Sequence, residues 1–250
     1  MNVGKVLGGF ALGLLVATSA AWAAETAGPA DAKKDAAQTK ASSGSAGEFV
    51  YRPPMRGAPA ARIGGGTRGT GDLTLELVVL APDHTGLTTK EQPTLYWYVS
   101  KPVPARLEVT LINDEAIDPA LEQEVQSPRR GGIQRLDLGK TATKLKPGVE
   151  YRWFVSVVAD PDQRSDDVIA SGTIQRIMPD SALKGKIAGA DERTLARIYA
   201  DEGIWYDTID ALSRMIEKSP NDSGLREQRA ALLEQVGLQS AADYARDPGQ

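Results

Sequence analysis

The hydrophobic pattern of this chain is most regular in residues 145–158, where a Pro-Gly turn leads into an alternating segment. Tyr151, Trp153, Val155 and Val157 are separated by single residues that are mostly polar or smaller. Successive side chains of a strand point to opposite faces, so this alternation predicts a half-buried strand. We expect the folded part of the chain to be built around it.

Shorter alternating segments with turn residues between them fill the rest of residues 73–178. Pro82–Gly86 is one predicted turn, and no helical segment separates the strands to form the βαβ units of a parallel sheet. The turn before Tyr151 resembles the tyrosine corner of immunoglobulin-like sandwiches, in which a tyrosine hydroxyl ties down a turn. The seven expected strands begin near Leu73, Thr94, Leu107, Leu121, Ile133, Glu150 and Val168.

The period becomes helical in residues 188–237. Gly203 separates two predicted helices, Pro220 ends the second, and Ser223 is expected to cap a third that Gly237 stops. Residues 238–250 are predicted to be a C-terminal tail. The predicted fold class is therefore β-rich: an immunoglobulin- or fibronectin-III-like antiparallel β-sandwich followed by a small all-α helical hairpin region, α+β overall.

The helical spacing resembles a single tetratricopeptide unit, with Thr208 where that repeat usually has a smaller residue. One such unit cannot bury both of its faces alone, so we expect it to pack on the sandwich, on the third helix or on a partner. The residues that carry the resemblance are Leu195, Tyr199, Gly203, Trp205, Leu212, Met215 and Pro220.

The N-terminus has the layout of a secretory signal peptide, which we assign to residues 1–23. Lys5 precedes an apolar run, and Ala21-Trp-Ala23 fits the small-x-small cleavage rule, so we expect cleavage after Ala23. An uncleaved membrane anchor is the alternative, but the run is short and rich in Gly and Ala. Residues 24–48 have almost no large apolar side chains and are predicted to be a disordered linker.

The amino-acid composition excludes several classes of site and function. The chain contains no cysteine, which excludes disulfides, thiolate metal sites, cysteine nucleophiles and lipid attachment through an N-terminal cysteine. Its net charge of −4 gives no support for nucleic-acid binding. Together with the signal peptide, these features predict a soluble periplasmic or secreted protein of a Gram-negative bacterium, with no membrane span after cleavage and no cofactor.

Residues 49–72 form a Pro/Gly/Arg-rich arm with no acid between Glu48 and Asp72. Gly64-x-Gly66-x-x-Gly69 matches a dinucleotide fingerprint in spacing only, because that fingerprint must follow a strand and open a helix. Two interpretations remain: an ordered arm held across the domain by backbone hydrogen bonds, or an arginine-bearing site for an anion or a partner. The arginines concerned are Arg52, Arg56, Arg62 and Arg68.

Several blocks in one order are similar to the bacterial family called domain of unknown function 928. The resemblance spans residues 50–238, nearly the whole chain after the signal peptide and linker. It implies one continuous module, and the family has no assigned activity to carry over. The blocks are Tyr51–Pro59, Arg62–Gly69, Gly86–Thr88 with Pro93–Ser100, Tyr151–Phe154 with Asp160–Arg176, and Tyr199–Asp207.

Candidate catalytic and metal-binding residues are few. His84 is the single histidine, in an expected exposed turn, and no Gly-x-Ser-x-Gly motif accompanies it as a Ser-His-Asp mechanism would require. The loop of Asp160, Asp162, Asp166 and Asp167 has carboxylates for calcium. Arg164 stands where a calcium loop needs an oxygen ligand, which favours a hairpin loop whose acids are solvated or paired with that arginine.

We therefore predict a non-catalytic periplasmic interaction or accessory protein whose partner is another envelope protein. The expected contact surfaces are the arginine arm and the helical hairpin, including Trp205 and Tyr206. The alternatives are an envelope hydrolase or a carbohydrate-binding module using acids such as Glu76, Asp114 and Glu115, or a purely structural accessory protein.

Overall fold

The computed structural model describes residues 49–54, 62–66, 75–113 and 116–248, which all fall in one compact unit. The signal peptide and linker predicted for residues 1–48 lie outside these ranges, as do Arg56, Arg68, Asp114 and Glu115. Within the described ranges, no helix has both the length and the hydropathy to cross a membrane.

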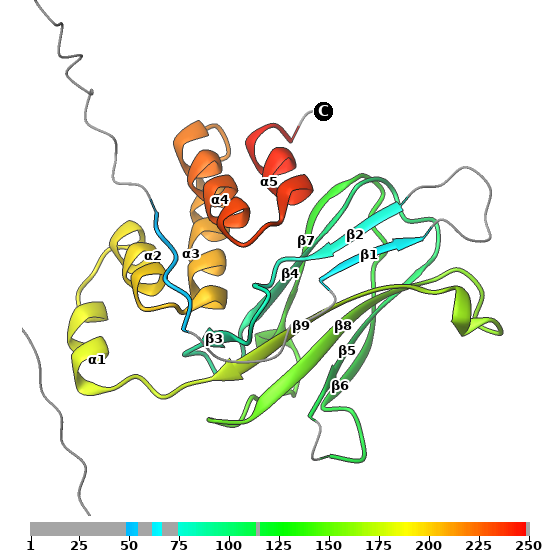
Figure 1. The fold of residues 1–250 in the computed structure, drawn as a ribbon, viewed down its shortest axis with the longest axis horizontal. Helices are drawn as coiled ribbons and strands as arrows, with labels where there is room; N and C mark the ends of the chain where they lie inside the picture. The colour runs from blue at the N-terminus through cyan, green and yellow to red at the C-terminus, as the bar shows by residue number, and fades with distance from the viewer. Residues whose placement is uncertain (1–48, 55–61, 67–74, 114–115, 249–250) are drawn as a thin grey trace, which may run out of the picture. The chain divides into compact units, whose positions relative to one another are not determined.

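The strands of the described chain form two sheets (Figure 1). The first has the order β1-β2-β4-β7, with β1 at Ile63–Gly66, β2 at Leu75–Val79, β4 at Thr94–Val99 and β7 at Gly132–Asp137. The second has the order β3-β9-β8-β5-β6, with β3 at Gly86–Thr88, β9 at Val168–Arg176, β8 at Glu150–Val158, β5 at Arg106–Ile112 and β6 at Leu121–Val125. Neighbouring strands run antiparallel except β3 and β9, which are parallel.

All seven predicted strand segments are present, and β1 and β3 are additional. β1 is the glycine run of the arm, paired with β2, and β3 begins at the end of the predicted turn. Both are short edge segments that take their extended shape from a neighbouring strand and not from their own alternation. The purely antiparallel arrangement we expected is thus wrong at one edge, where β3 joins β9.

The predicted central strand is β8, flanked by β5 and β9. Its alternating residues Tyr151, Trp153, Val155 and Val157 are all buried, as the period indicates. The Tyr151 hydroxyl accepts a hydrogen bond from the backbone N–H of Lys146 at 3.2 Å. This bond fixes the turn to the strand that follows it.

β4 is buried on both faces, so the first sheet is covered on two sides at this strand. Tyr96 and Tyr98 point toward the helices, where they contact Asp210 and Tyr244 respectively. Alternation places Leu95, Trp97 and Val99 on the opposite face, and they belong to the core that buried residues of both sheets share.

Five helices follow the strands in the described chain: α1 at Ser181–Ile187, α2 at Glu192–Asp201, α3 at Trp205–Lys218, α4 at Ser223–Gln235 and α5 at Gln239–Arg246. α2, α3 and α4 are the predicted helices. Asp222, and not Ser223, caps α4, because its carboxylate accepts a hydrogen bond from Leu225 N at 3.1 Å.

α1 and α5 were not predicted, and α5 occupies the segment expected to be a tail. The residues that α5 buries are small, namely Ala241, Ala242 and Ala245, so they give little hydrophobic signal in the sequence. α5 packs on α4 and contacts β7, which places the end of the chain against the first sheet (Figure 1).

Replacing Tyr151 with Phe tests the bond that holds the turn. The ring stays buried while the hydroxyl acceptor is lost, so we expect the free energy of unfolding to fall by about 1 kcal/mol. Urea unfolding followed by tryptophan fluorescence measures this change. An unchanged midpoint would show that the Lys146 bond contributes nothing to stability.

Candidate functional site

Residues 49–52, the start of the arm, are held against the helices by backbone and amide contacts. Tyr51 N donates to Gln235 Oε1 at 2.8 Å, and the same side chain donates to the Phe49 carbonyl at 2.6 Å. Arg52 N donates to the Ala200 carbonyl at 3.1 Å. In residues 49–52, the contacts agree with the interpretation of an ordered arm held by backbone hydrogen bonds.

Gly203 allows the backbone of the arm to approach the α2–α3 turn closely. Gly203 has a φ of +70°, and a Cβ there would lie 2.5 Å from the Arg52 carbonyl oxygen. Of the arm's arginines, Arg52 is exposed and lies 3.8 Å from Asp201, whereas Arg62 donates to the Val236 carbonyl at 2.5 Å. These two arginines thus contact the helices at separate places and do not converge on one ligand.

Trp205 and Tyr206, expected on a partner-binding surface, are buried, and this expectation is corrected. Their exposed fractions are 0% and 2%. Trp205 Nε1 donates to the Leu80 carbonyl, and the Tyr206 hydroxyl donates to the Thr173 carbonyl while accepting from Trp153 Nε1. They join α3 to the two sheets and are unavailable to a partner in this fold.

His84 is not an exposed turn residue, because its side chain is only 14% exposed. Its Nε2 lies 2.8 Å from the Tyr51 hydroxyl, and its Nδ1 lies 3.1 Å from Asp83 Oδ1. Burial, and secondarily the charge of Asp83, raises the pKa of Tyr51, so that hydroxyl stays protonated. The arrangement links the arm to the β2–β3 turn and orients the imidazole.

The acidic loop joins β8 to β9, as predicted, and contains a short 3-10 turn at Arg164–Asp166. Arg164 Nε donates to Asp167 at 2.8 Å, and its Nη2 donates to Glu108 at 2.8 Å. Asp160 accepts a hydrogen bond from Asp162 N within the loop. Across the described residues, no group of three or more acidic or histidine side chains is placed to hold a metal ion.

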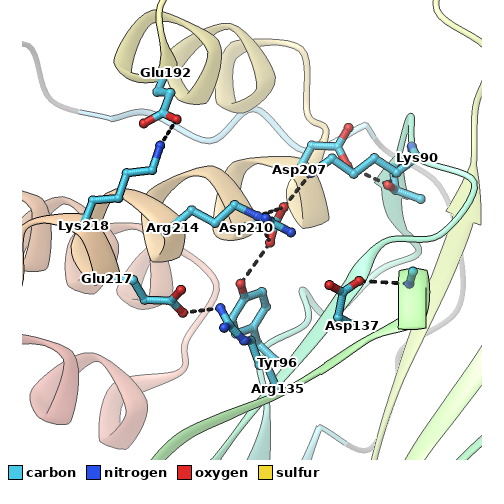
Figure 2. A network of polar contacts seen from close by, with 12 residues as sticks. Lys90, Tyr96, Arg135, Asp137, Glu192, Asp207, Asp210, Arg214, Glu217 and Lys218 are labelled. Carbon is cyan, nitrogen blue, oxygen red and sulfur yellow. Dashed lines mark hydrogen bonds and ion pairs between the residues drawn. The ribbon is translucent and has the colours of Figure 1, made fainter. Parts of the chain in front are cut away.

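Sequence reasoning missed a polar network on α3, which Figure 2 shows. Asp207 accepts hydrogen bonds from the Thr88 hydroxyl at 2.6 Å and from Thr89 N at 3.0 Å. Asp210 lies 2.5 Å from Lys90 Nζ and accepts from the Tyr96 hydroxyl at 2.9 Å. Asp207 and Asp210 are three residues apart, so they lie close together on a helix face that is otherwise apolar. This spacing was the signal in the sequence that could have identified the network.

Burial acts on both carboxyls of this network, with opposite outcomes. Desolvation raises the pKa of Asp207, and the charge of Lys90 and the threonine bonds offset only part of that. Desolvation also tends to raise the pKa of Asp210. The interactions of its carboxylate with Lys90, Tyr96 and Arg214 together outweigh this effect, and the pKa of Asp210 is lowered. Asp210 is therefore the ionised centre of the network, although its side chain is only 1% exposed.

A groove lies beside this network, at the seam between the first sheet and the helices. Three cavities share Tyr244 in their linings, and we call them together the Tyr244 groove. The first has a volume of about 820 Å³, the second about 450 Å³ and the third about 630 Å³. The first is lined by Tyr98, Ser100, Lys101, Pro102, Gln126, Ser127, Pro128, Arg129, Arg130, Gly131, Gln134, Tyr244 and Pro248.

Two glycines shape the groove. Gly132 has a φ of +137°, and a Cβ at this position would collide with the Tyr244 hydroxyl. A Cβ on Gly131 would lie 2.6 Å from the Ser100 carbonyl oxygen. Glycine at both positions lets the start of β7 and the residue before it approach Ser100 on one side and Tyr244 of α5 on the other. The ring centres of Tyr98 and Tyr244 lie 5.4 Å apart.

The first two cavities are strongly basic. Their linings hold six basic side chains and one acid, Glu217, which pairs with Arg135. Lys101, Arg129 and Arg130 form no ion pair with any described residue. The third cavity is different, since Asp243 and Asp247 outnumber Arg246 there. The first and second cavities thus carry local positive charge on a chain of net charge −4.

The sequence matches the family described as Domain of Unknown Function (DUF928) over residues 63–246. The chain belongs to the DUF928 family. The residues that line the Tyr244 groove lie inside this DUF928 region, apart from Asp247 and Pro248, whereas Tyr51 and Arg52 of the arm lie before it.

Other comparisons add nothing to the DUF928 assignment. No curated protein matches the chain. Among solved structures, a multi-domain immunophilin from Arabidopsis thaliana is 10% identical, over 77% of this chain and 97% of its own, with a TM-score of 0.16. A TM-score this low supports no statement about the fold or the function of this DUF928 protein.

Replacing Asp210 with Asn tests the network on α3. The change weakens the hydrogen bonds that Lys90, Tyr96 and Arg214 donate to an ionised carboxylate, so we expect the free energy of unfolding at pH 7 to fall by about 2 kcal/mol. Because the folded pKa is lowered, this stabilisation is present above the ordinary value of 3.8 and is lost as the pH falls below it. Urea unfolding at a series of pH values measures both effects.

Asp118→Asn serves as the control for Asp210→Asn, because Asp118 is exposed. We expect it to change the free energy of unfolding by less than about 0.5 kcal/mol. A difference between wild type and Asp210→Asn that does not decrease at any pH below 3.8 would contradict the assignment of Asp210 as the ionised member.

Proposed function

We propose that this chain is an exported, non-catalytic binding protein that holds an acidic segment of another envelope protein in the Tyr244 groove. One observation carries the proposal: Lys101, Arg129 and Arg130 surround a cavity of about 820 Å³ and pair with no described acid. Unpaired cations around a concave surface attract carboxylates and raise the rate of encounter with them. The chain as a whole has a net charge of −4, so this positive charge is a local property of the cavity.

The finer fold assignment belongs to the same proposal. We infer an immunoglobulin- or fibronectin-III-like sandwich, in which β2, β4 and β7 correspond to strands A, B and E. β9, β8, β5 and β6 then correspond to G, F, C and C′. The Tyr151 bond to Lys146 supports this, because a tyrosine corner makes the same contact at the same strand.

For the helices, we propose a tetratricopeptide-like unit made of α2 and α3. Its support is the spacing of apolar residues, the packing of α2 on α3 and the turn at Gly203 between them. The burial of Trp205 moves the proposed contact surface away from this hairpin and toward the groove. The hairpin would then act as scaffold, held to the sheets through α3.

A carbohydrate-binding module is the second candidate. Tyr98 and Tyr244 offer aromatic faces in the groove, and Gln126 and Gln134 offer amide groups that can donate to and accept from hydroxyls. A hydrolase has less support, because Glu76 accepts a hydrogen bond from Ser240 at 2.6 Å. Of the loop acids, Asp167 pairs with Arg164, and Asp160 accepts from Asp162 N.

A triple variant with Lys101, Arg129 and Arg130 replaced by Glu tests the binding proposal. We expect the wild type to bind a fluorescein-labelled oligo-glutamate peptide, and the triple variant to bind at least about tenfold more weakly because cations become acids. Fluorescence anisotropy at increasing salt measures the affinity, which should fall as screening grows.

Lys140, Lys146 and Lys184 replaced by Glu provide the matched control. These lysines are exposed, lie outside the groove and form no ion pair with a described residue, so the change of net charge is identical. Equal loss of peptide binding in both triple variants would refute the groove as the site. Binding of neutral oligosaccharides by a wild type that ignores the peptide would favour the carbohydrate module instead.

Export is tested separately. We expect the protein expressed with its own N-terminus in a Gram-negative host to be recovered from the periplasm and to begin at Ala24. N-terminal sequencing of the periplasmic fraction measures this. Recovery of the uncleaved chain in the membrane fraction would support an anchor in place of a signal peptide.

A further inference from the structure

Arg229, on α4, is a buried guanidinium that lines the second cavity of the Tyr244 groove. The residue is 8% exposed. Its Nη1 donates to the Ser213 hydroxyl at 3.4 Å, and its Nε has no hydrogen-bond partner among the described residues. It forms no ion pair with any of them.

A buried charge without a partner is unfavourable, since burial removes the hydration that stabilises it. Burial lowers the pKa of Arg229 to about 10, and the charge of Arg226 acts in the same direction. Tyr96, Tyr244 and Glu217 act in the opposite direction without cancelling it. The environment therefore disfavours the cation that arginine nevertheless retains at neutral pH.

Other side chains that line the second cavity add to its excess of positive charge. Arg226 also lines it and uses two of its N–H donors on backbone carbonyls, with Nη1 2.5 Å from the Pro220 oxygen and Nε 3.3 Å from the Arg246 oxygen, so its Nη2 group is left for a ligand. Glu217 is the acid in the lining, and it pairs with Arg135. Three guanidinium groups thus line one cavity of about 450 Å³, and its single carboxylate is engaged by Arg135, which leaves Arg226 and Arg229 without a carboxylate partner among the described residues.

We propose that the second cavity is a binding site for a small oxyanion, such as phosphate or a carboxylate, held by Arg229 with Ser213 and Arg226. Arginine presents its donors in a fixed fork that matches two oxygens of such an anion. Ser213 accepts from Arg229, so its hydroxyl hydrogen remains able to donate to the same ligand. The bound anion would offset both guanidinium charges where water reaches them poorly.

This inference goes beyond the binding of an acidic protein segment, because the ligand is a small free anion and the residues differ. Lys101, Arg129 and Arg130 line the first cavity, whereas Arg229, Arg226 and Ser213 line the second. The alternative is that Arg229 only packs in the core. In that case a methionine of similar length would serve equally well under all solution conditions.

The experiment compares full-length wild type with Arg229→Met, using inorganic phosphate and acetate as probes and sodium chloride at matched ionic strength as the reference. We expect phosphate or acetate to raise the thermal midpoint of the wild type by several degrees over chloride, as a ligand of the folded state must. In Arg229→Met this anion-dependent shift should vanish, while the midpoint in chloride stays the same or rises. Comparing phosphate with acetate shows which oxyanion the site prefers.

Two further variants make the result specific. Glu217→Gln removes the acid at the cavity wall and should strengthen anion binding severalfold by isothermal titration calorimetry. The Lys101, Arg129 and Arg130 triple variant should keep the anion response, so a failure of the acidic-segment proposal leaves this one intact. Conversely, Arg229→Met should still bind the oligo-glutamate peptide.

The proposal is overturned if phosphate and acetate stabilise the wild type no more than chloride does, or if Arg229→Met responds as the wild type does. Should Arg229→Met fail to fold, the arginine Nε–H resonances of the wild type decide the matter. The signal of Arg229 is the Nε–H signal that is missing in Arg229→Lys. If phosphate shifts this signal in the wild type, the site is supported, and if phosphate does not shift it, the site is refuted.

Discussion

The contact on which this structure depends is the one that α3 makes with the sheets. Trp205 and Tyr206 enter the core at the start of the helix. Asp207, the next residue, accepts a hydrogen bond from Thr88 at the end of β3, and Asp210, one turn later, accepts one from Tyr96 of β4. These four residues lie in the first two turns of α3, and their contacts with both sheets fix the position and the rotation of the helix. α4 packs on α3, and α5 packs on α4, so the place of the later helices follows from that of α3.

The groove is a consequence of this docking. β4 is covered by the second sheet on one face and by helices on the other, but the helices do not cover the whole of the first sheet. Where α5 meets β7, Tyr244 stands against Gly132, and the cavities open around it. The groove thus needs no dedicated domain, because it is the seam between two packed layers.

Two charged side chains of opposite sign, Asp210 and Arg229, are buried close to this seam, and they differ in whether an oppositely charged partner is present. Asp210 is surrounded by Lys90, Tyr96 and Arg214, which hold it ionised and make it structural. Arg229 has a neutral hydroxyl as its contact and a pKa that burial has lowered. A paired buried charge supports a fold, whereas an unpaired one next to a cavity points to a ligand, and this contrast underlies our reading of the second cavity.

The sequence by itself determined the strands and the three main helices, because their signals are local. The alternation around Trp153 and the periodicity of α2 and α3 depend only on neighbours in the chain. Tertiary structure alone decided that Tyr206 is buried, that β4 is covered on both faces, and that Arg229 is unpaired while Arg164 is not. Those properties depend on contacts between residues far apart in the sequence: Tyr206 and Trp153, Tyr96 and Asp210, Arg229 and Ser213, and Arg164 and Glu108. No local pattern records such pairs, because burial and partner choice are set when separate elements pack together.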